Sequence, residues 1–167
     1  MLLIGESINA TIPSVNQAII NKDKAFIAKL TQEQCAAGAH YIDVNAGTGK
    51  GDETKDLLWL TAIVQGASDK PLCLDSSDPK ALEAAVSLCQ MPPILNSICA
   101  EPKKLSTLLP IIEKNPCRVI ALAHGEGGIP DSVEERMRFA SIVIKELRHA
   151  GLNDDAIFLD PVLMGLS

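Results

Sequence analysis

Aromatic residues and clusters of basic residues are both scarce in this sequence. Phe, Trp and Tyr together make up 3% of the chain, which leaves little material for stacking on exposed nucleobases. The formal net charge is -6 and the Lys and Arg residues are scattered, so the sequence has no basic patch for a phosphate backbone. These two deficits argue against a nucleic acid as partner.

Metal-ligand and disulfide spacing is also missing. The cysteines are odd in number, include no Cys-x-x-Cys pair and fall mostly within apolar segments. They are Cys35, Cys73, Cys89, Cys99 and Cys117. We interpret them as reduced, buried side chains of a cytoplasmic protein, and we expect the chain to bind no metal.

The N-terminus lacks the features of a targeting or membrane segment. It has no basic region and turns polar at Glu6, so we expect neither a signal peptide nor a membrane span. Hydrophobic residues make up 47% and charged residues 22%, a globular balance. We therefore expect residues 1–167 to form a single domain.

Short apolar runs alternate with longer segments of helical period along the whole chain. This is the pattern of consecutive βα units around a parallel sheet. Each run is apolar on both faces, as a strand buried on both sides requires. The runs predict strands at residues 2–5, 41–45, 72–75, 94–97, 119–122 and 157–160.

Five major helices are expected between these strands, with a short extra helical turn around residues 13–21. Asp78, which precedes a proline, is typical of an N-cap residue. Ser132 and Glu135 form a capping box, and Gly151 suits the position just after that helix.

The polar residues at strand ends decide between a doubly wound sheet and a barrel. In a barrel these ends converge on one mouth, where such enzymes build their sites. A doubly wound sheet usually carries a glycine-rich phosphate loop at its first turn, which this sequence lacks. The polar residues are Glu6, Asn9, Asp43, Asn45, Asp75, Ser76, Asn96, Ser97 and Asp160. We therefore predict an α/β protein with a (β/α)8 barrel of TIM type.

The chemistry of such a mouth favours a flat heterocycle over a phosphate. Carboxylates without neighbouring cations repel phosphate, whereas Asp and Asn together can pair with adjacent N–H, NH2 and C=O groups. A pterin ring presents such an edge. Buried polar groups that match it would reject other ligands, which would leave them unpaired.

Five segments together resemble one enzyme family in order and spacing. They are residues 3–9 (LIGESIN), 43–45 (DVN), 72–76 (LCLDS), 94–97 (ILNS) and 159–161 (LDP). The resemblance is to the methyltetrahydrofolate:corrinoid protein methyltransferases. Their pterin-binding fold also occurs in the folate domain of cobalamin-dependent methionine synthase and, more distantly, in dihydropteroate synthase.

The resemblance implies roles for the strand-end residues. Asp75, Asn96 and Asp160 would hold the pterin ring. Further residues would line the same mouth: Glu6, Asn9, Asp43, Asn45 and Ser97. The implied reaction moves the N5-methyl group of methyltetrahydrofolate to the Co(I) corrinoid of a partner, a corrinoid or corrinoid iron–sulfur protein. Family members are commonly homodimers.

The leaving N5 needs a proton or a strong hydrogen bond. In the family an asparagine on a later strand contacts N5, and we expect that asparagine beyond Ser167. A closed barrel needs eight strands and about 250 residues. The sequence, with about six β-strands, therefore predicts a C-terminally incomplete barrel whose open edges would favour association.

Several alternatives stay open. The chain could be a non-catalytic pterin-binding module. It could resemble dihydropteroate synthase, although residues 46–51 (AGTGKG) lack the expected Ser-Thr-Arg-Pro. Asp43, Asp75 and Asp160 could instead hold Mg²⁺.

Individual residues also have structural interpretations. Asn96 could satisfy backbone groups and Asp160 could form a turn. Asp75 could cap a helix, although Asp78 already fills that position. His124, in the glycine-rich segment 124–128, is more typical of a loop than of a catalyst.

Overall fold

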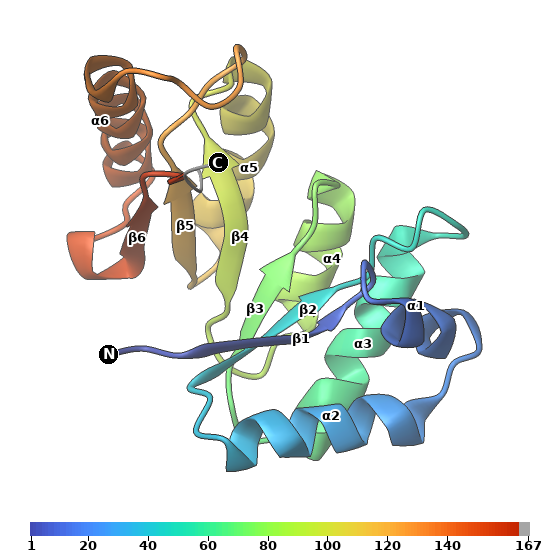
Figure 1. Cartoon of the computed structure of the whole chain (residues 1–167). Coiled ribbons are helices and arrows are strands. Elements are labelled where there is room, and N and C mark those ends of the chain that lie inside the picture. The colour runs from blue at the N-terminus through green and yellow to red at the C-terminus, as the bar shows by residue number, and fades with distance from the viewer. Residues whose placement is uncertain (164–167) are drawn as a thin grey trace. The chain divides into compact units, whose positions relative to one another are not determined.

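The chain alternates strands with helices throughout the part that the structure describes. The structure is a computed structural model and describes residues 1–163. Within them lie six strands and six α-helices, in two compact units divided between Ile94 and Leu95 (Figure 1). The α/β prediction is confirmed. None of the helices in this range combines the length and the apolar character needed to cross a membrane.

Unit 1 contains three βα repeats and one additional short helix. Its elements are β1 (Ile4–Asn9), α1 (Pro13–Ile20), α2 (Lys24–Ala36), β2 (Tyr41–Asn45), α3 (Glu53–Ala67), β3 (Leu72–Asp75) and α4 (Pro79–Leu88). The three strands pair in parallel in chain order. Helices α2, α3 and α4 pack against them (Figure 1). All three strands therefore end at the same edge of this part of the sheet.

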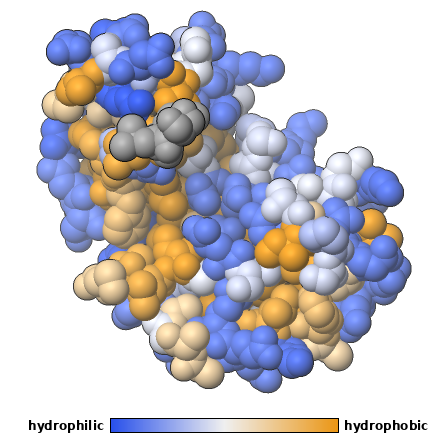
Figure 2. All heavy atoms as spheres, viewed as in Figure 1, coloured by the Kyte–Doolittle hydropathy of each residue, from blue (hydrophilic) through white to orange (hydrophobic). Residues whose placement is uncertain are grey.

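Unit 2 continues the alternation. Its elements are β4, which starts at the unit boundary (Ile94–Cys99), α5 (Pro102–Lys114), β5 (Arg118–Leu122), α6 (Val133–His149), a 3₁₀ turn (Asp154–Ala156) and β6 (Ile157–Asp160). Strands β5 and β6 pair in parallel, and α6 packs against both. Figure 2 shows hydrophobic residues over β5 and β6 beside a largely hydrophilic α6. Leu159 of β6 is 46% exposed.

The predicted helix ends are confirmed. The Asp78 carboxylate accepts a hydrogen bond from the Lys80 N–H at 2.9 Å, and the Ser132 hydroxyl accepts one from the Glu135 N–H at 3.2 Å. Each such cap stabilises a helix by about 1 kcal/mol. Gly151 follows α6 with φ of +91°, a conformation that glycine adopts without steric cost.

Three predicted strands have different bounds in the structure. For β5 the difference is one residue, because the strand starts at Arg118 and not at residue 119. Strand β1 was predicted at residues 2–5 but covers Ile4–Asn9. Its pairing with β2 shifts between Gly5 and Ile8, so a bulge carries the strand through the exposed Glu6 and Ser7. Strand β4 was predicted to end at residue 97 and continues to Cys99.

Alternating side chains give the unit 1 sheet one apolar face against the helices. Ile42, Val44, Leu72 and Leu74 are at most 1% exposed, and so are Leu57 and Leu60 of α3. Burying a side chain of this size contributes about 1.5–3 kcal/mol. Because side chains alternate along a strand, Asp43 and Asn45 lie on the opposite face of β2.

Candidate functional site

Three polar side chains stand in one row across the end of the unit 1 sheet. Asn9, Asn45 and Asp75 are the last residues of β1, β2 and β3. Asn9 pairs with Asn45 in the register, and Asn45 pairs with Asp75. The structure therefore brings together three of the residues that the sequence predicted for a ligand site.

Asn45 and Asp75 are in direct contact. The Asn45 side-chain Nδ2 donates a hydrogen bond to Asp75 Oδ2 at 2.9 Å, and Asn45 Oδ1 accepts one from the Gly47 N–H at 3.0 Å. Both side chains are half-buried. A carboxylate has acceptor capacity on both oxygens, so the Asn45 bond orients Asp75 and leaves Oδ1 available to a ligand with N–H groups.

A second row lies one step deeper on the same face. Asp43 pairs with Cys73 in the register, and both side chains are buried. Burial raises the pKa of the Cys73 thiol, and the nearby carboxylates of Asp43, Asp75 and Glu6 raise it further. Cys73 therefore stays a thiol and donates a hydrogen bond to Asp43, which helps to hold that buried carboxylate in place.

The remaining predicted residues of β1 are bound locally or exposed. Asn9 Oδ1 accepts hydrogen bonds from the Thr11 N–H at 2.9 Å and the Thr11 hydroxyl at 2.7 Å. Glu6 is exposed, and its charge is close enough to contribute to the pKa of Cys73.

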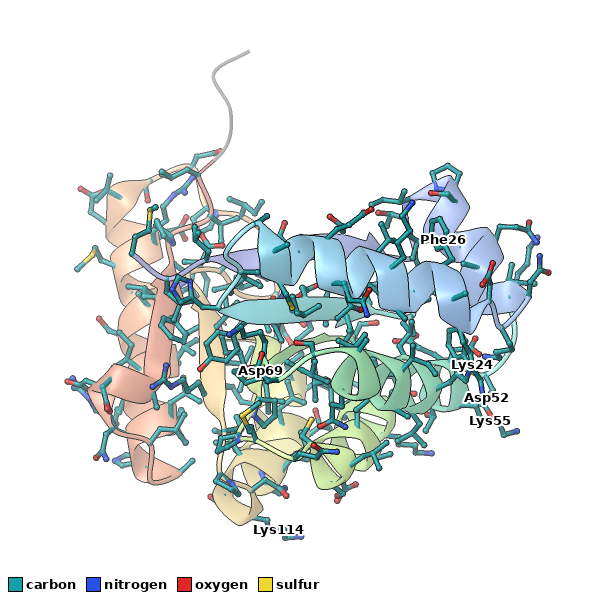
Figure 3. The ribbon with its side chains drawn as sticks, turned by 90° about the horizontal axis from the view of Figure 1, so that it is seen from below. Lys24, Phe26, Asp52, Lys55, Asp69 and Lys114 are labelled. Carbon is teal, nitrogen blue, oxygen red and sulfur yellow. The ribbon has the colours of Figure 1, made fainter. Side chains whose placement is uncertain are left out.

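Ser76 is buried and donates a hydrogen bond to the Glu53 carboxylate at the start of α3. Its hydroxyl also accepts from the Asp78 N–H at 3.0 Å, so it connects β3 to two helix starts. Beside Glu53, the N-cap residue Asp52 forms an ion pair with Lys55 at 3.0 Å (Figure 3).

The other predicted residues belong to unit 2. Asn96 and Ser97 lie in β4 and are half-buried. Asp160 ends β6 and is exposed, and its Oδ1 accepts a hydrogen bond from the Val162 N–H at 2.7 Å. This hydrogen bond supports the interpretation of Asp160 as a turn residue, although the turn does not use Oδ2. The asparagine expected beyond Ser167 lies outside the described residues.

A group of residues that the sequence analysis did not assemble lies in unit 2. Cys99, Glu101 and His124 place a sulfur, a carboxylate oxygen and an imidazole nitrogen within 4.8 Å of one another. Burial raises the pKa of the Cys99 thiol, while the Glu101 N–H and the Lys104 ammonium lower it in part. No spacing rule could have found this group, because its third member is 23 positions beyond Glu101.

The alternating βα units are typical of an α/β barrel fold, and comparison with solved structures agrees. Dihydropteroate synthase from Xanthomonas albilineans, solved with indole-2-carboxylic acid and 6-chloroguanine, matches 96% of this chain and 59% of its own. The TM-score is 0.69 at 20% identity. This likeness shows the fold.

The chain belongs to the pterin binding enzyme family, which it matches over residues 5–166. A methylcorrinoid:tetrahydrofolate methyltransferase from Eubacterium limosum is 40% identical to it over 169 residues, which cover 100% of this chain and 62% of that protein. A methionine synthase from Mycobacterium leprae is 24% identical over 96% of this chain and 14% of its own length. The chain thus spans less than two thirds of both relatives.

Proposed function

We propose that this protein moves a methyl group between N5 of a tetrahydrofolate and the corrinoid of a partner protein. The observation that carries the proposal is the oriented Asn45–Asp75 pair at the strand ends, in a chain 40% identical to the Eubacterium limosum enzyme. That relative is named for transfer from methylcorrinoid to tetrahydrofolate. The resemblance in sequence implies transfer in the reverse direction, from methyltetrahydrofolate to the corrinoid. A single site serves both directions because the forward and reverse reactions share one transition state.

In this proposal Asp75 binds the donor edge of the pterin. Its carboxylate, oriented by Asn45, would accept hydrogen bonds from adjacent N–H and NH2 groups of the ring. Asn96 and Asp160 would complete ring binding. Glu6, Asn9, Asp43, Asn45 and Ser97 would line the mouth. Hydrogen bonds of this kind fix the plane of the ring, and therefore the direction in which N5 and its methyl group point.

The chemical step requires control of one proton. When the methyl group leaves N5, the electron pair of the broken bond stays on nitrogen and N5 takes up a proton. The cobalt of the corrinoid supplies the methyl acceptor in this direction and the methyl donor in the other. The residues of this chain bind and orient the folate, and the group that contacts N5 is expected beyond Ser167.

The accompanying assignments follow from the same proposal. The folate is a substrate, the partner is a corrinoid or corrinoid iron–sulfur protein, and the setting is the cytoplasm. Residues 1–167 would belong to one pterin-binding barrel domain, and the protein would act as a homodimer. Each of these is testable on the purified protein, for example by sedimentation for the oligomeric state.

Calorimetry with methyltetrahydrofolate tests the binding part of the proposal. Asp75→Asn and Asn96→Ala should each weaken binding by about tenfold or more, because each removes a hydrogen bond worth roughly 1.5 kcal/mol or more. Asp69→Ala is the matched control, since Asp69 is 86% exposed and lies before β3, away from the strand ends (Figure 3). Unchanged folate affinity in folded Asp75→Asn protein would refute the site.

Methyl transfer tests the reaction itself. Supplied with a Co(I) corrinoid protein, the protein should demethylate methyltetrahydrofolate, with loss of the Co(I) absorption. Binding without transfer would favour the non-catalytic pterin-binding alternative. Activity that a chelator abolishes, with folate binding also lost, would favour the Mg²⁺ alternative. Formation of a C–N bond between a pterin and an arylamine would favour a dihydropteroate synthase.

A further inference from the structure

Three side chains with metal-binding atoms meet at the carboxyl ends of β4 and β5. Cys99 is the last residue of β4, Glu101 is the N-cap residue of α5, and His124 follows the end of β5 by two positions. Their ligand atoms all lie within 4.8 Å of one another. Cys99 is 0% exposed, and the other two residues are half-buried.

Glu101 occupies an N-cap position without acting as a side-chain cap. Helix α5 has no hydrogen bond from its cap residue's side chain, and the Glu101 carboxylate accepts instead from the Cys99 thiol. An N-cap residue is usually Ser, Thr, Asp or Asn, whose short side chains reach the first N–H groups. The longer Glu side chain is thus directed towards the sulfur and not towards its own helix.

The imidazole of His124 is held in an orientation typical of a metal ligand. Its Nδ1 lies 3.3 Å from the Gly125 carbonyl oxygen, to which a protonated Nδ1 donates. Metal-binding histidines usually donate one ring N–H to a carbonyl or carboxylate, which leaves the other nitrogen for the metal. In His124 that arrangement makes Nε2 the ligand atom.

The backbone on both sides of the group is fixed. The Ala100 N–H donates to the His124 carbonyl at 2.9 Å, which ties the end of β4 to the segment after β5. Gly125 lies so close to the Phe139 ring of α6 that an added Cβ would stand 2.3 Å from a ring carbon. The residue after Cys99 is therefore hydrogen-bonded directly to His124, and the residue after His124 packs against α6.

Cysteine spacing led us to expect no bound metal, but the geometry of this group points the other way: we propose that Cys99, Glu101 and His124 bind one Zn²⁺ ion, with water as the fourth ligand. A thiolate, an imidazole and a carboxylate suit Zn²⁺, whereas Mg²⁺ and Ca²⁺ prefer all-oxygen sites. Three protein ligands and a water are a common zinc arrangement. On binding, the Cys99 S–H bond breaks, the proton passes to solvent and a Zn–S bond forms, so the thiolate and carboxylate together balance the charge of the ion.

The distances require only small adjustments. Zinc bonds of about 2.3 Å to sulfur and 2.0–2.1 Å to nitrogen or oxygen place tetrahedral donors roughly 3.5 Å apart. The ligand atoms now lie within 4.8 Å of one another, so the most distant pair would have to approach by about 1 Å. Rotation of the half-buried Glu101 and His124 side chains supplies that movement, while Cys99 stays in place.

Zinc at this position would connect β4 with the glycine-rich segment 124–128. That segment contains a turn in which the Gly128 N–H donates to the Gly125 carbonyl at 3.0 Å. The metal would restrain its first residue, His124, at the strand ends of the barrel. This inference does not depend on the proposed methyl transfer, because it concerns a different group of residues.

The test uses the full chain, dialysed against metal-free buffer after exposure to Zn²⁺ and analysed for bound metal by mass spectrometry. We expect one zinc per chain in the wild type, and none in Cys99→Ser or His124→Gln. Cys117→Ser is the matched control, since Cys117 is another half-buried cysteine of unit 2 and precedes β5 at its amino end. The Cys117→Ser variant should keep one zinc per chain.

Cobalt provides a spectroscopic readout that a merely structural role would not change. With Co²⁺ in place of zinc, the wild type and Cys117→Ser should show a thiolate-to-cobalt charge-transfer band in the near ultraviolet. Cys99→Ser should lack it. If Cys99→Ser does not fold, His124→Gln and Glu101→Gln, checked by circular dichroism, decide through their zinc content. Wild-type protein without bound zinc, or the same zinc content in folded His124→Gln, would overturn the proposal.

Discussion

The contact between Asn45 and Asp75 leads to the sharpest prediction about the ligand site. Asn45→Ala removes the donor that holds Asp75 Oδ2 at 2.9 Å and the acceptor that receives the Gly47 N–H at 3.0 Å. Asp75 keeps its carboxylate but loses the group that orients it. If Asp75 binds the pterin, the variant should bind folate more weakly even though no proposed contact of Asp75 with the ring has been deleted.

The expected magnitude follows from the two bonds. A hydrogen bond to a charged group contributes about 1.5–3 kcal/mol, and the half-buried position of this pair favours the lower end. A loss of roughly 1.4 kcal/mol corresponds to a tenfold change in the dissociation constant. We therefore expect methyltetrahydrofolate to bind Asn45→Ala about tenfold more weakly than the wild type. The free energy of unfolding should fall by about 1.5 kcal/mol as well, since both bonds belong to the folded protein.

Calorimetry on the folded variants measures this difference. Gln65→Ala is the matched control, because it also removes one donor and one acceptor, the bonds to the Leu88 carbonyl (3.2 Å) and the Gln90 N–H (2.7 Å). Those bonds lie at the carboxyl end of α4, away from the strand ends. Equal folate affinity in Asn45→Ala and Gln65→Ala would refute the claim that Asn45 prepares Asp75 for the ligand.

Three further predictions concern unit 2. Gly125→Ala should lower the free energy of unfolding by about 1–3 kcal/mol, because the new methyl group would overlap the Phe139 ring; an unchanged denaturation midpoint would contradict this. Burial raises the pKa of Cys117 to about 11, so its alkylation, followed by peptide mass spectrometry, should be slow at neutral pH and accelerate up to that value. The pKa of Asp154 lies below its usual value because Arg148 binds it at 2.7 and 2.8 Å. A lowered folded-state pKa gives stability above the unfolded pKa of about 3.9 that is lost as the pH falls further, so acid melts of Asp154→Asn should lack this component.

The sequence was sufficient for those strands whose ends coincide with a change of residue type. The predicted ranges 41–45, 72–75 and 157–160 agree with β2, β3 and β6, because each apolar run stops at the polar residue that ends the strand. Strand β1 was harder to predict since Glu6 and Ser7 interrupt its apolar pattern. Only the pairing with β2 shows that the strand continues through them.

The two candidate sites also differ in how far the sequence could predict them. That Asn45 and Asp75 would lie at one edge could be predicted, because both end consecutive parallel strands. Their direct bond depends on the register, which the sequence does not state. The group of Cys99, Glu101 and His124 depends on side-chain directions at the ends of two strands, so it could not be predicted from spacing.

The bulge in β1 has a consequence for how this strand can vary in length. From the pairs Ile4–Tyr41 and Gly5–Ile42, a regular ladder would place Ile8 opposite Asn45, but the shift places Asn9 there. Strand β1 thus contains one extra residue that has no pairing partner in β2. A chain that lacked Ser7 would form an uninterrupted ladder and still end with its asparagine beside Asn45. Deletions at this point would therefore shorten the strand without displacing the residue at its end.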